Sequence, residues 1–186
     1  MLTLVFGIPG VGKTTILEEV VKIQKDLVVE KFGSIAFEIA KNQSLVVKRD
    51  EMRQLDIDKQ KKIQIETFEH IDKLHRENNK VMIDTHAAIR TKCGYWPGCP
   101  EKLLKIINPD SYILVETDPE IILRHRILDN TRQRDDDNLK VIEEHQMINR
   151  AFAATYATMT NGCIFIVENI EGRPEIAASK IAKLFK

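Results

Sequence analysis

The chain has 186 residues, enough for one domain with a sizeable hydrophobic core. Lys and Arg number 28, as do Asp and Glu, so the formal net charge is zero; this argues against a protein that coats nucleic acid or an anionic membrane. Hydrophobic residues make up 43% of the chain, yet no segment reaches the roughly 18–20 apolar residues of a transmembrane helix. The N-terminus also lacks the charged region of a signal peptide.

The three cysteines, Cys93, Cys99 and Cys163, are odd in number and have no CxxC spacing. This pattern indicates neither a zinc site nor a disulfide framework. We therefore expect a reduced, cytoplasmic protein, with neither nucleic acid nor a membrane among its partners.

Short apolar runs alternate with helical patterns, which predicts an α/β fold with a parallel sheet. The expected strands are Leu2–Phe6, Leu27–Phe32, Val81–Asp84, Ser111–Glu116 and Cys163–Glu168. All but the second are continuous apolar runs, typical of strands covered on both faces. The expected helices are Lys13–Lys25, Asp58–Asn78, Asp118–Asp129 and Arg173–Lys186.

Two segments depart from this alternation. Thr85–Pro100 contains several Gly and Pro residues around Tyr95 and Trp96, and we expect a structured loop there. Asp129–Asn138 has no apolar residue, which is typical of a mobile surface segment.

A glycine-rich phosphate-binding pattern follows the first expected strand. Its residues are Gly7, Ile8, Pro9, Gly10, Val11, Gly12, Lys13 and Thr14, with Thr15 next. Glycines let backbone N–H groups converge on a triphosphate, and the helix N-terminus adds its positive dipole end. We expect Lys13 to reach the β- and γ-phosphates and the Thr14 hydroxyl to bind Mg²⁺.

The third expected strand ends in a carboxylate, Asp84. An aspartate in this place commonly steadies Mg²⁺ in nucleotide-binding enzymes of this class. The alternative is an ordinary strand-end aspartate that caps a turn.

Arginines gather around the polar segment. Arg124 and Arg126 precede it, Arg132 and Arg134 lie in it, and Arg150 follows it. Arginine neutralises transferred phosphoryl charge and binds phosphate at two points, so we expect a lid that closes over the triphosphate. The alternative is a solvated face with Arg–Asp surface pairs.

A kinase also needs an acceptor pocket. We expect Phe32-Gly33-Ser34 to end the second strand, with Ser34 bonded to an acceptor and Arg53 clamping its phosphate. Arg49 and Arg53 lie four residues apart, on one side of a helix if that segment is helical. An exposed pair bonded to neighbouring carboxylates is the competing interpretation.

Several motifs together resemble the archaeal adenylate kinases, over nearly the whole chain. They are residues 7–15, 32–34, 49–56, the Ile-Asp-Thr-His at 83–86, the Gly-Tyr-Trp-Pro-Gly at 94–98, and residues 131–135 and 143–151. The phosphate loop is shared by many enzymes, whereas the Asp-Thr-His and the last two motifs are much more specific to this family.

The resemblance implies reversible transfer from Mg-ATP to AMP, giving two ADP, by a homotrimer. It implies a three-layer α/β/α P-loop fold with a five-stranded parallel sheet of order 2-3-1-4-5. In this reading residues 1–186 form one domain, with an AMP-binding insertion at about 32–80 and a short lid at about 129–138. Arg53 belongs to the AMP side, Arg132 and Arg134 to the lid. Asp84 and His86 lie at the floor between the two sites, and Thr85 and His86 belong with Ser34 to the AMP-binding residues.

The residues by themselves leave other functions open. A kinase of CMP, UMP or shikimate has the same phosphate loop, as does a P-loop switch or an ATPase coupled to nucleic acid. A nucleotide-dependent scaffold finds no support in the sequence. His86 is open to interpretation as a general base, but a phosphate acceptor is already ionised near neutral pH and requires none.

Overall fold

The computed structural model describes residues 1–91, 93–128 and 138–185, and only the backbone of Arg53. Its strands are β1 (Leu2–Phe6), β2 (Val28–Lys31), β3 (Val81–Asp84), β4 (Ala88–Thr91), β5 (Gly94–Pro97), β6 (Ser111–Glu116) and β7 (Cys163–Glu168). Its α-helices are α1 (Lys13–Ile23), α2 (Phe32–Asn42), α3 (Ile57–Glu77), α4 (Glu101–Ile107), α5 (Pro119–Leu128), α6 (Leu139–Thr160) and α7 (Pro174–Ala182). Two 3-10 helices, η1 (Arg49–Gln54) and η2 (Lys183–Phe185), complete the set. None of these helices is both long enough and apolar enough to cross a membrane.

Five parallel strands form the central sheet, in the order β2-β3-β1-β6-β7. Strands β4 and β5 form a separate antiparallel hairpin. Numbered without that hairpin, the sheet has the order 2-3-1-4-5, which confirms the topology that the resemblance implies.

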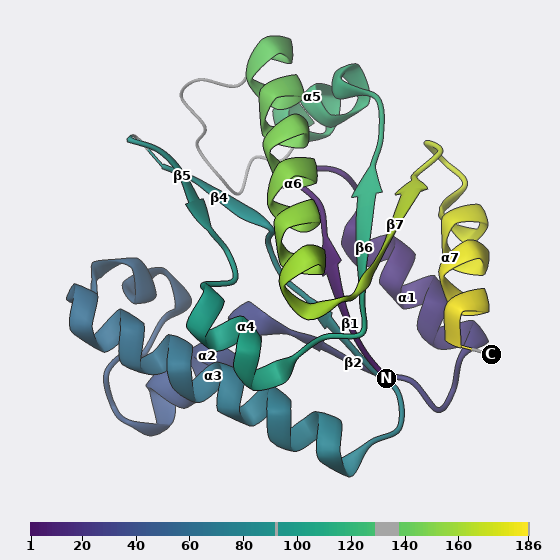
Figure 1. Cartoon of the computed structure of the whole chain (residues 1–186). Helices are drawn as coiled ribbons and strands as arrows, with labels where there is room; N and C mark the ends of the chain where they lie inside the picture. Colours follow the sequence, from purple (N-terminus) through teal and green to yellow (C-terminus); the bar gives the residue numbers. More distant parts are fainter. Residues whose placement is uncertain (92, 129–137, 186) are drawn as a thin grey trace.

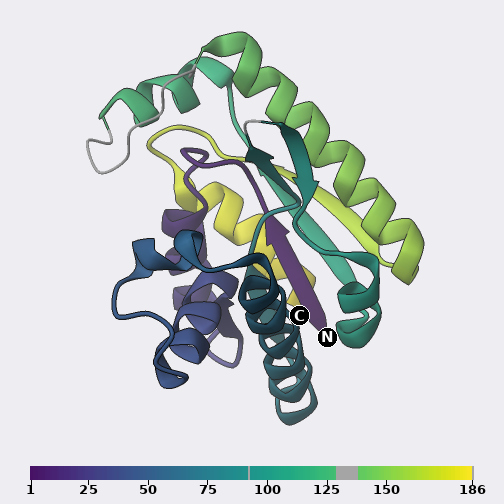
Figure 2. The same ribbon diagram turned by 90° about the vertical axis from the view of Figure 1, so that its left-hand side faces the viewer.

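The sheet lies between two helical layers because successive side chains of a strand point to opposite faces. Leu2, Leu4 and Phe6 of β1 belong to a core shared with α3, α4 and α6. Val5, between them, belongs to a second core shared with α1 and α7. Figures 1 and 2 show the two layers on opposite sides of the sheet, which confirms the α/β/α architecture.

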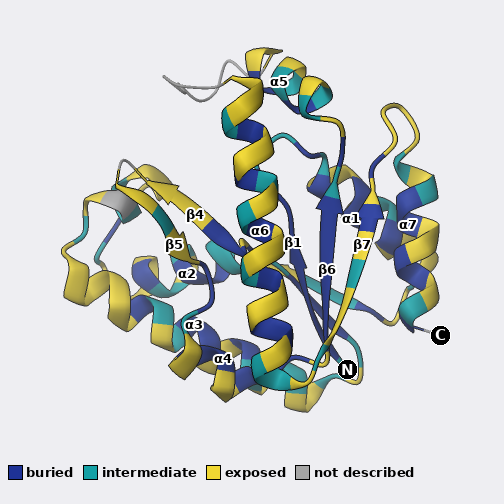
Figure 3. Cartoon of the chain, turned by 45° about the horizontal axis from the view of Figure 1, so that its top comes forward, coloured by how far each residue is buried: buried dark blue, intermediate teal, exposed yellow. Residues whose placement is uncertain are grey.

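The edge strand β7 differs from its sequence-based prediction. Ile164 and Ile166 are exposed to 37% and 55%, and Val167 is the buried residue of the strand. The yellow segments of β7 in Figure 3 show this edge beside the buried β6. An apolar run therefore does not distinguish a central strand from an edge strand, because the distinction depends on whether another strand pairs beside it.

Two segments fold differently from the predictions. The second strand ends at Lys31, and Phe32-Gly33-Ser34 begins helix α2. Arg49 to Arg53 lies in a 3-10 helix, in which residues three apart eclipse, so the four-residue spacing no longer implies a shared face. Helices α4 and α6 were not predicted; in α6 the buried side of the helix includes the polar residues His145 and Asn149, which interrupt its apolar pattern.

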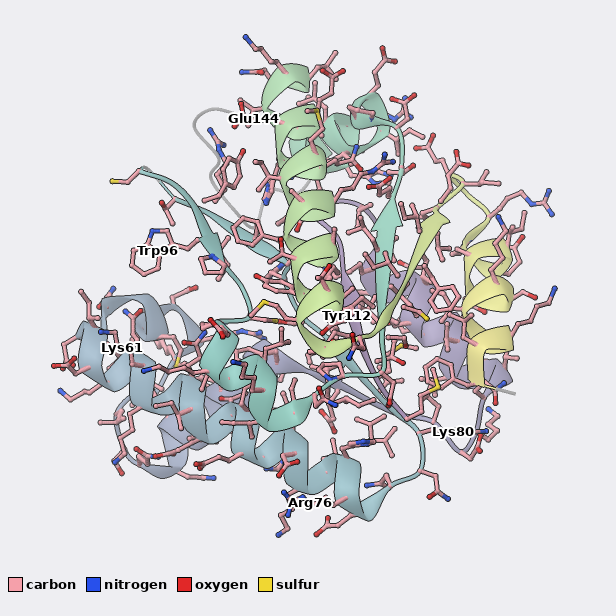
Figure 4. The ribbon with its side chains drawn as sticks, in the orientation of Figure 1. Lys61, Arg76, Lys80, Trp96, Tyr112 and Glu144 are labelled. Atoms are coloured by element: carbon pink, nitrogen blue, oxygen red, sulfur yellow. The ribbon has the colours of Figure 1, made fainter. Side chains whose placement is uncertain are left out.

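The predicted loop between Thr85 and Pro100 contains the β4–β5 hairpin, which projects beside α6 (Figure 1). At its base Gly98 N–H donates to the Ala87 carbonyl at 2.8 Å. A Cβ on Gly98 would lie 1.8 Å from the His86 carbonyl oxygen, so a side chain at this position cannot be accommodated without movement of the backbone. The exposed Trp96 projects from the hairpin on the side away from α6 (Figure 4).

Buried polar side chains of α6 hold the backbone at the start of the hairpin. Asn149 Oδ1 accepts from the Ala88 N–H at 3.1 Å, and His145 Nε2 lies 3.3 Å from the Ala88 carbonyl. Tyr156 donates its hydroxyl to the Ala87 carbonyl at 2.7 Å. These contacts give backbone groups at the start of the hairpin hydrogen-bond partners from α6.

We predict that Gly98→Ala lowers the free energy of unfolding by more than about 4 kcal/mol, because the new methyl group collides with backbone rather than with a flexible side chain. The measurement is urea denaturation. Gly94→Ala is the matched control: its φ is +115° but no atom lies within 4 Å, so we expect a loss of about 1–3 kcal/mol from backbone strain. Equal losses in the two variants would contradict the packing argument.

We predict that His145 lowers the free energy of unfolding as the pH falls below the pKa that this residue has in the unfolded chain. Burial, with Arg126 and Arg90 nearby, lowers the pKa of His145, against the opposing influence of the Ala88 carbonyl and Glu144. The unfolded chain therefore takes up a proton at a pH where the folded chain does not, and each unit of difference costs about 1.4 kcal/mol. Urea unfolding between pH 7.5 and 5 should show a smaller fall for His145→Gln than for the wild type. The same substitution at the exposed His70 is the control.

Candidate active site

A cavity of about 610 Å³ opens at the carboxyl ends of β1 and β3. The phosphate loop forms one wall, through Ile8, Pro9, Gly10, Gly12, Lys13 and Thr14. The remaining lining residues are Lys31, Phe32, Gly33, Arg49, Asp84, Thr85, His86 and His125. Residues expected to serve the donor and residues from the expected acceptor side therefore face one shared space.

The loop conformation requires glycine at several positions. Gly10 and Gly12 have φ of +93° and +87°, which L side chains rarely adopt. A Cβ on Gly7 would lie 2.9 Å from the Val115 carbonyl oxygen of the neighbouring strand β6. The spacing of the glycines thus follows from the backbone path and from its close approach to the sheet.

Lys13, the first residue of α1, folds back over the loop. Its ammonium donates to the Gly7 carbonyl at 2.8 Å and lies 3.5 Å from Asp84 Oδ1. Burial lowers the pKa of Lys13, whereas the Asp84 carboxylate opposes that shift and the charge of Lys31 adds to it. The ammonium is therefore held at the cavity wall by one carbonyl and one carboxylate.

Oxygen groups suited to a hard cation lie at the same wall. Asp84 ends β3 beside β1, in register with Val5, and Thr14 lies in the first turn of α1. The next residue, Thr85, is buried and donates its backbone N–H to the Val5 carbonyl at 3.0 Å. Carboxylate and hydroxyl oxygens are the ligands that Mg²⁺ prefers, so Asp84 and Thr14 fit that ion.

The expected acceptor side is only partly assembled around the cavity. His86 and Thr85 line it, whereas Ser34, in the first turn of α2, does not. The cavity is also lined by Arg49, the predicted neighbour of Arg53 on the acceptor side, and by Lys31, which no sequence pattern indicated. Arg49 lies against Gly33, where a Cβ would be 2.6 Å from its Nη2, so the glycine makes room for the guanidinium.

The arginines of the expected lid have different surroundings. Arg132 and Arg134 lie outside the described residues, as do residues 129–137 of the polar segment. Arg124 donates to Glu171 Oε2 at 2.7 Å and is half exposed. Arg150 forms a two-point ion pair with Glu116, which raises the pKa of Arg150, and both residues line a different cavity of about 510 Å³. In this conformation neither Arg124 nor Arg150 lines the phosphate-loop cavity.

Arg126 of the arginine cluster and two residues outside the candidate set, His125 and Asn169, contact backbone carbonyls of the phosphate loop. Arg126 Nε donates to the Pro9 carbonyl at 2.8 Å, and His125 Nδ1 lies 2.8 Å from the Gly10 carbonyl. Asn169 Nδ2 donates to the Val11 carbonyl at 2.8 Å. The arginine cluster pointed toward Arg126, but no motif marked His125 or Asn169, because their proximity to the loop arises from the packing of α5 and of the segment after β7.

Comparison with known proteins identifies the family. A family model described as an AAA domain matches residues 6–143. An adenylate kinase of Thermoplasma acidophilum is 42% identical over 184 residues, covering 99% of this chain and 98% of the relative. The chain belongs to the adenylate kinase family. Adenylate kinases of Methanopyrus kandleri and Methanothermobacter thermautotrophicus are each 40% identical, covering 95% and 100% of this chain and 93% and 99% of the relatives. The predicted resemblance to archaeal adenylate kinases is thus confirmed.

Solved structures of other proteins share the fold of this adenylate kinase family member. A shikimate kinase from Bacteroides thetaiotaomicron superposes with a TM-score of 0.61 at 12% identity, covering 100% of this chain and 98% of the other. The Deinococcus radiodurans tunicamycin resistance protein gives 0.62 at 11% identity, covering 99% and 94%. At such low identity the likeness concerns the fold alone.

Proposed function

We propose that this chain is an adenylate kinase that transfers a phosphoryl group reversibly from Mg-ATP to AMP, giving two ADP. The observation that carries the proposal is the 42% identity to an adenylate kinase over 99% of the chain. The geometry supports it because one cavity joins the phosphate loop to a second basic wall at Lys31 and Arg49. Two anionic substrates need cations from both sides when they are brought together in line.

On the donor side, we propose that Gly7–Thr15 holds the triphosphate, with Lys13 on the β- and γ-phosphates. Lys13 supplies a buried positive charge whose present partners, Gly7 and Asp84, fix the position of its ammonium. Thr14 and Asp84 would hold Mg²⁺, which neutralises charge on the β- and γ-oxygens when bound. Among the described residues no group of three His, Cys, Asp or Glu side chains gathers as a metal site. One or two protein oxygens suffice for a Mg²⁺ whose other ligands are water and phosphate.

On the acceptor side, we propose that Ser34, Arg53, Thr85 and His86 contribute to AMP binding, together with Arg49, which lines the cavity. What supports this role for Arg49 is that its guanidinium lies against Gly33 and that both residues line the cavity. The segment from about 32 to 80 is the proposed AMP-binding insertion of one domain. No side chain needs to act as a base, since the AMP phosphate is already ionised at neutral pH.

Further assignments rest on the family resemblance. We propose that the segment from about 129 to 138 is a lid in which Arg132 and Arg134 meet the transferred phosphoryl group. Arg124 and Arg150 would join them only after rearrangement, because both are paired with carboxylates away from the cavity. A homotrimeric assembly and a cytoplasmic location are proposals of the same kind.

The proposal predicts ADP formation that requires both Mg-ATP and AMP. The assay incubates the purified protein with Mg-ATP and, in turn, AMP, CMP, UMP or shikimate, and quantifies ADP by chromatography. AMP-dependent ADP in the ratio of two per ATP consumed is the expected result. ADP formation that depends on another acceptor, or that needs none, would contradict the proposal.

We also predict that Lys13→Met lowers turnover on the order of a hundredfold or more, because a preorganised charge on the transferred group is lost. Lys22→Met is the matched control, since Lys22 is on the same helix but 65% exposed and paired with Glu19. Steady-state rates and urea unfolding are measured for both variants. A Lys13 variant that unfolds like the wild type and keeps its turnover would place the donor site elsewhere.

A further inference from the structure

Every backbone carbonyl of the phosphate loop from Gly7 to Gly12 has a hydrogen-bond partner within the protein. The six contacts are Lys13 Nζ to Gly7 O, Val11 N to Ile8 O, Arg126 Nε to Pro9 O, His125 Nδ1 with Gly10 O, Asn169 Nδ2 to Val11 O and Ile16 N to Gly12 O. Three of these partners are side chains from outside the loop. They come from the last turns of α5 and from the segment that follows β7.

The donors that bind the loop carbonyls also determine the direction of the loop N–H groups. In a trans peptide the carbonyl and the following N–H point in opposite directions, and the described chain has no cis peptide. A donor that holds the Val11 carbonyl therefore turns the Gly12 N–H to the other side. Likewise, the bond from Arg126 to the Pro9 carbonyl orients the Gly10 N–H. Gly10 and Gly12 both line the cavity.

Hydrogen bonds of its own backbone hold Asn169 in place for this contact. It is 8% exposed, its N–H donates to the Glu116 carbonyl at 2.7 Å, and its own carbonyl accepts from Thr117 Oγ1 at 2.7 Å. These bonds fix the backbone on both sides of the side chain. Asn169 is thus anchored to the end of β6 rather than to the loop that it supports.

The fit between Asn169 and the loop is tight. A Cβ on Gly12 would lie 2.4 Å from Asn169 Nδ2, so the glycine leaves just enough room for the amide. The other atom of that amide, Oδ1, is enclosed without a hydrogen-bond partner among the described residues. An enclosed acceptor without a partner is unfavourable. The N–H donor is therefore the part of this side chain that the site uses.

We infer that Asn169 is a positioning residue of the donor site: it holds the Val11–Gly12 peptide so that the Gly12 N–H faces the triphosphate. Arg126 holds the Pro9–Gly10 peptide in the same way, whereas the Val11 N–H of the peptide held by His125 donates to the Ile8 carbonyl. Asn169 does not line the cavity and acts on the nucleotide only through the loop. The inference rests on the proposed function of the loop as the ATP site.

The test replaces the amide by groups of similar size. Asn169→Leu removes the donor, and Asn169→Asp removes it while keeping the size of the side chain, because an aspartate is ionised near neutral pH. Asn78→Leu and Asn78→Asp are matched controls, because Asn78 Nδ2 donates to the Leu74 carbonyl at 2.9 Å at the end of α3, away from the loop. The measurements are the KM values for ATP and AMP, the Kd of Mg-ADP by calorimetry, and the urea unfolding midpoint.

We expect Asn169→Leu to raise the KM for ATP and the Kd of Mg-ADP about tenfold, with the KM for AMP within twofold of the wild type. Asn169→Asp should raise the KM for ATP at least as much as Asn169→Leu, because the carboxylate lacks an N–H donor and repels the Val11 carbonyl oxygen. The Asn78 variants should leave the ratio of the two KM values unchanged.

Two results would overturn the inference. One is an ATP KM within twofold of the wild type in a folded Asn169→Leu protein. The other is an equal rise of both KM values together with a lower unfolding midpoint, which describes a purely structural residue. Failure of the proposed function looks different: the wild type itself would show no AMP-dependent transfer, while Mg-ADP binding would still report on Asn169.

Discussion

The pairing of the neighbouring strands β1 and β3 brings the Lys13 ammonium close to the Asp84 carboxylate, at the carboxyl ends of these strands. The register places Val5 opposite Asp84, so the loop that leaves β1 begins beside that carboxylate. Slippage by one residue would move Leu2, Leu4 and Phe6 from one core to the other, so burial on both faces maintains the register. A contact between charged groups in the cavity wall thus depends on the apolar packing of two strands far apart in the sequence.

The hairpin gives the floor of the cavity a second support. The motif around Gly98 packs on the His86 carbonyl, and the α6 motif holds Ala88 through Asn149. Tyr156, further along the same helix, holds Ala87. Three segments that carry the family resemblance therefore form one contact network around the residues after Asp84. Their joint occurrence has a physical explanation, since each of them satisfies or accommodates backbone groups of the others.

The phosphate loop illustrates how a protein with zero net charge creates a local anion site. Its carbonyls are occupied by protein donors, which leaves N–H groups, the buried Lys13 and the nearby cations Lys31 and Arg49 around the cavity. Phosphoryl transfer needs such preorganised groups more than it needs a nucleophile from the protein. The arrangement is consistent with the membership of the chain in the adenylate kinase family.

The sequence alone determined those features that depend on local pattern. Apolar runs predicted four of the five strands of the sheet, and the glycine spacing predicted the loop, because φ near +90° and close backbone approach exclude other residues. Tertiary structure alone decided the rest. Whether β7 lies at an edge, whether Phe32 begins a helix, and which side chains reach the loop carbonyls depend on elements that meet only in the folded chain. Asn169 lies 158 residues from Val11 in the sequence, and the residues next to it in the chain do not indicate the hydrogen bond between them.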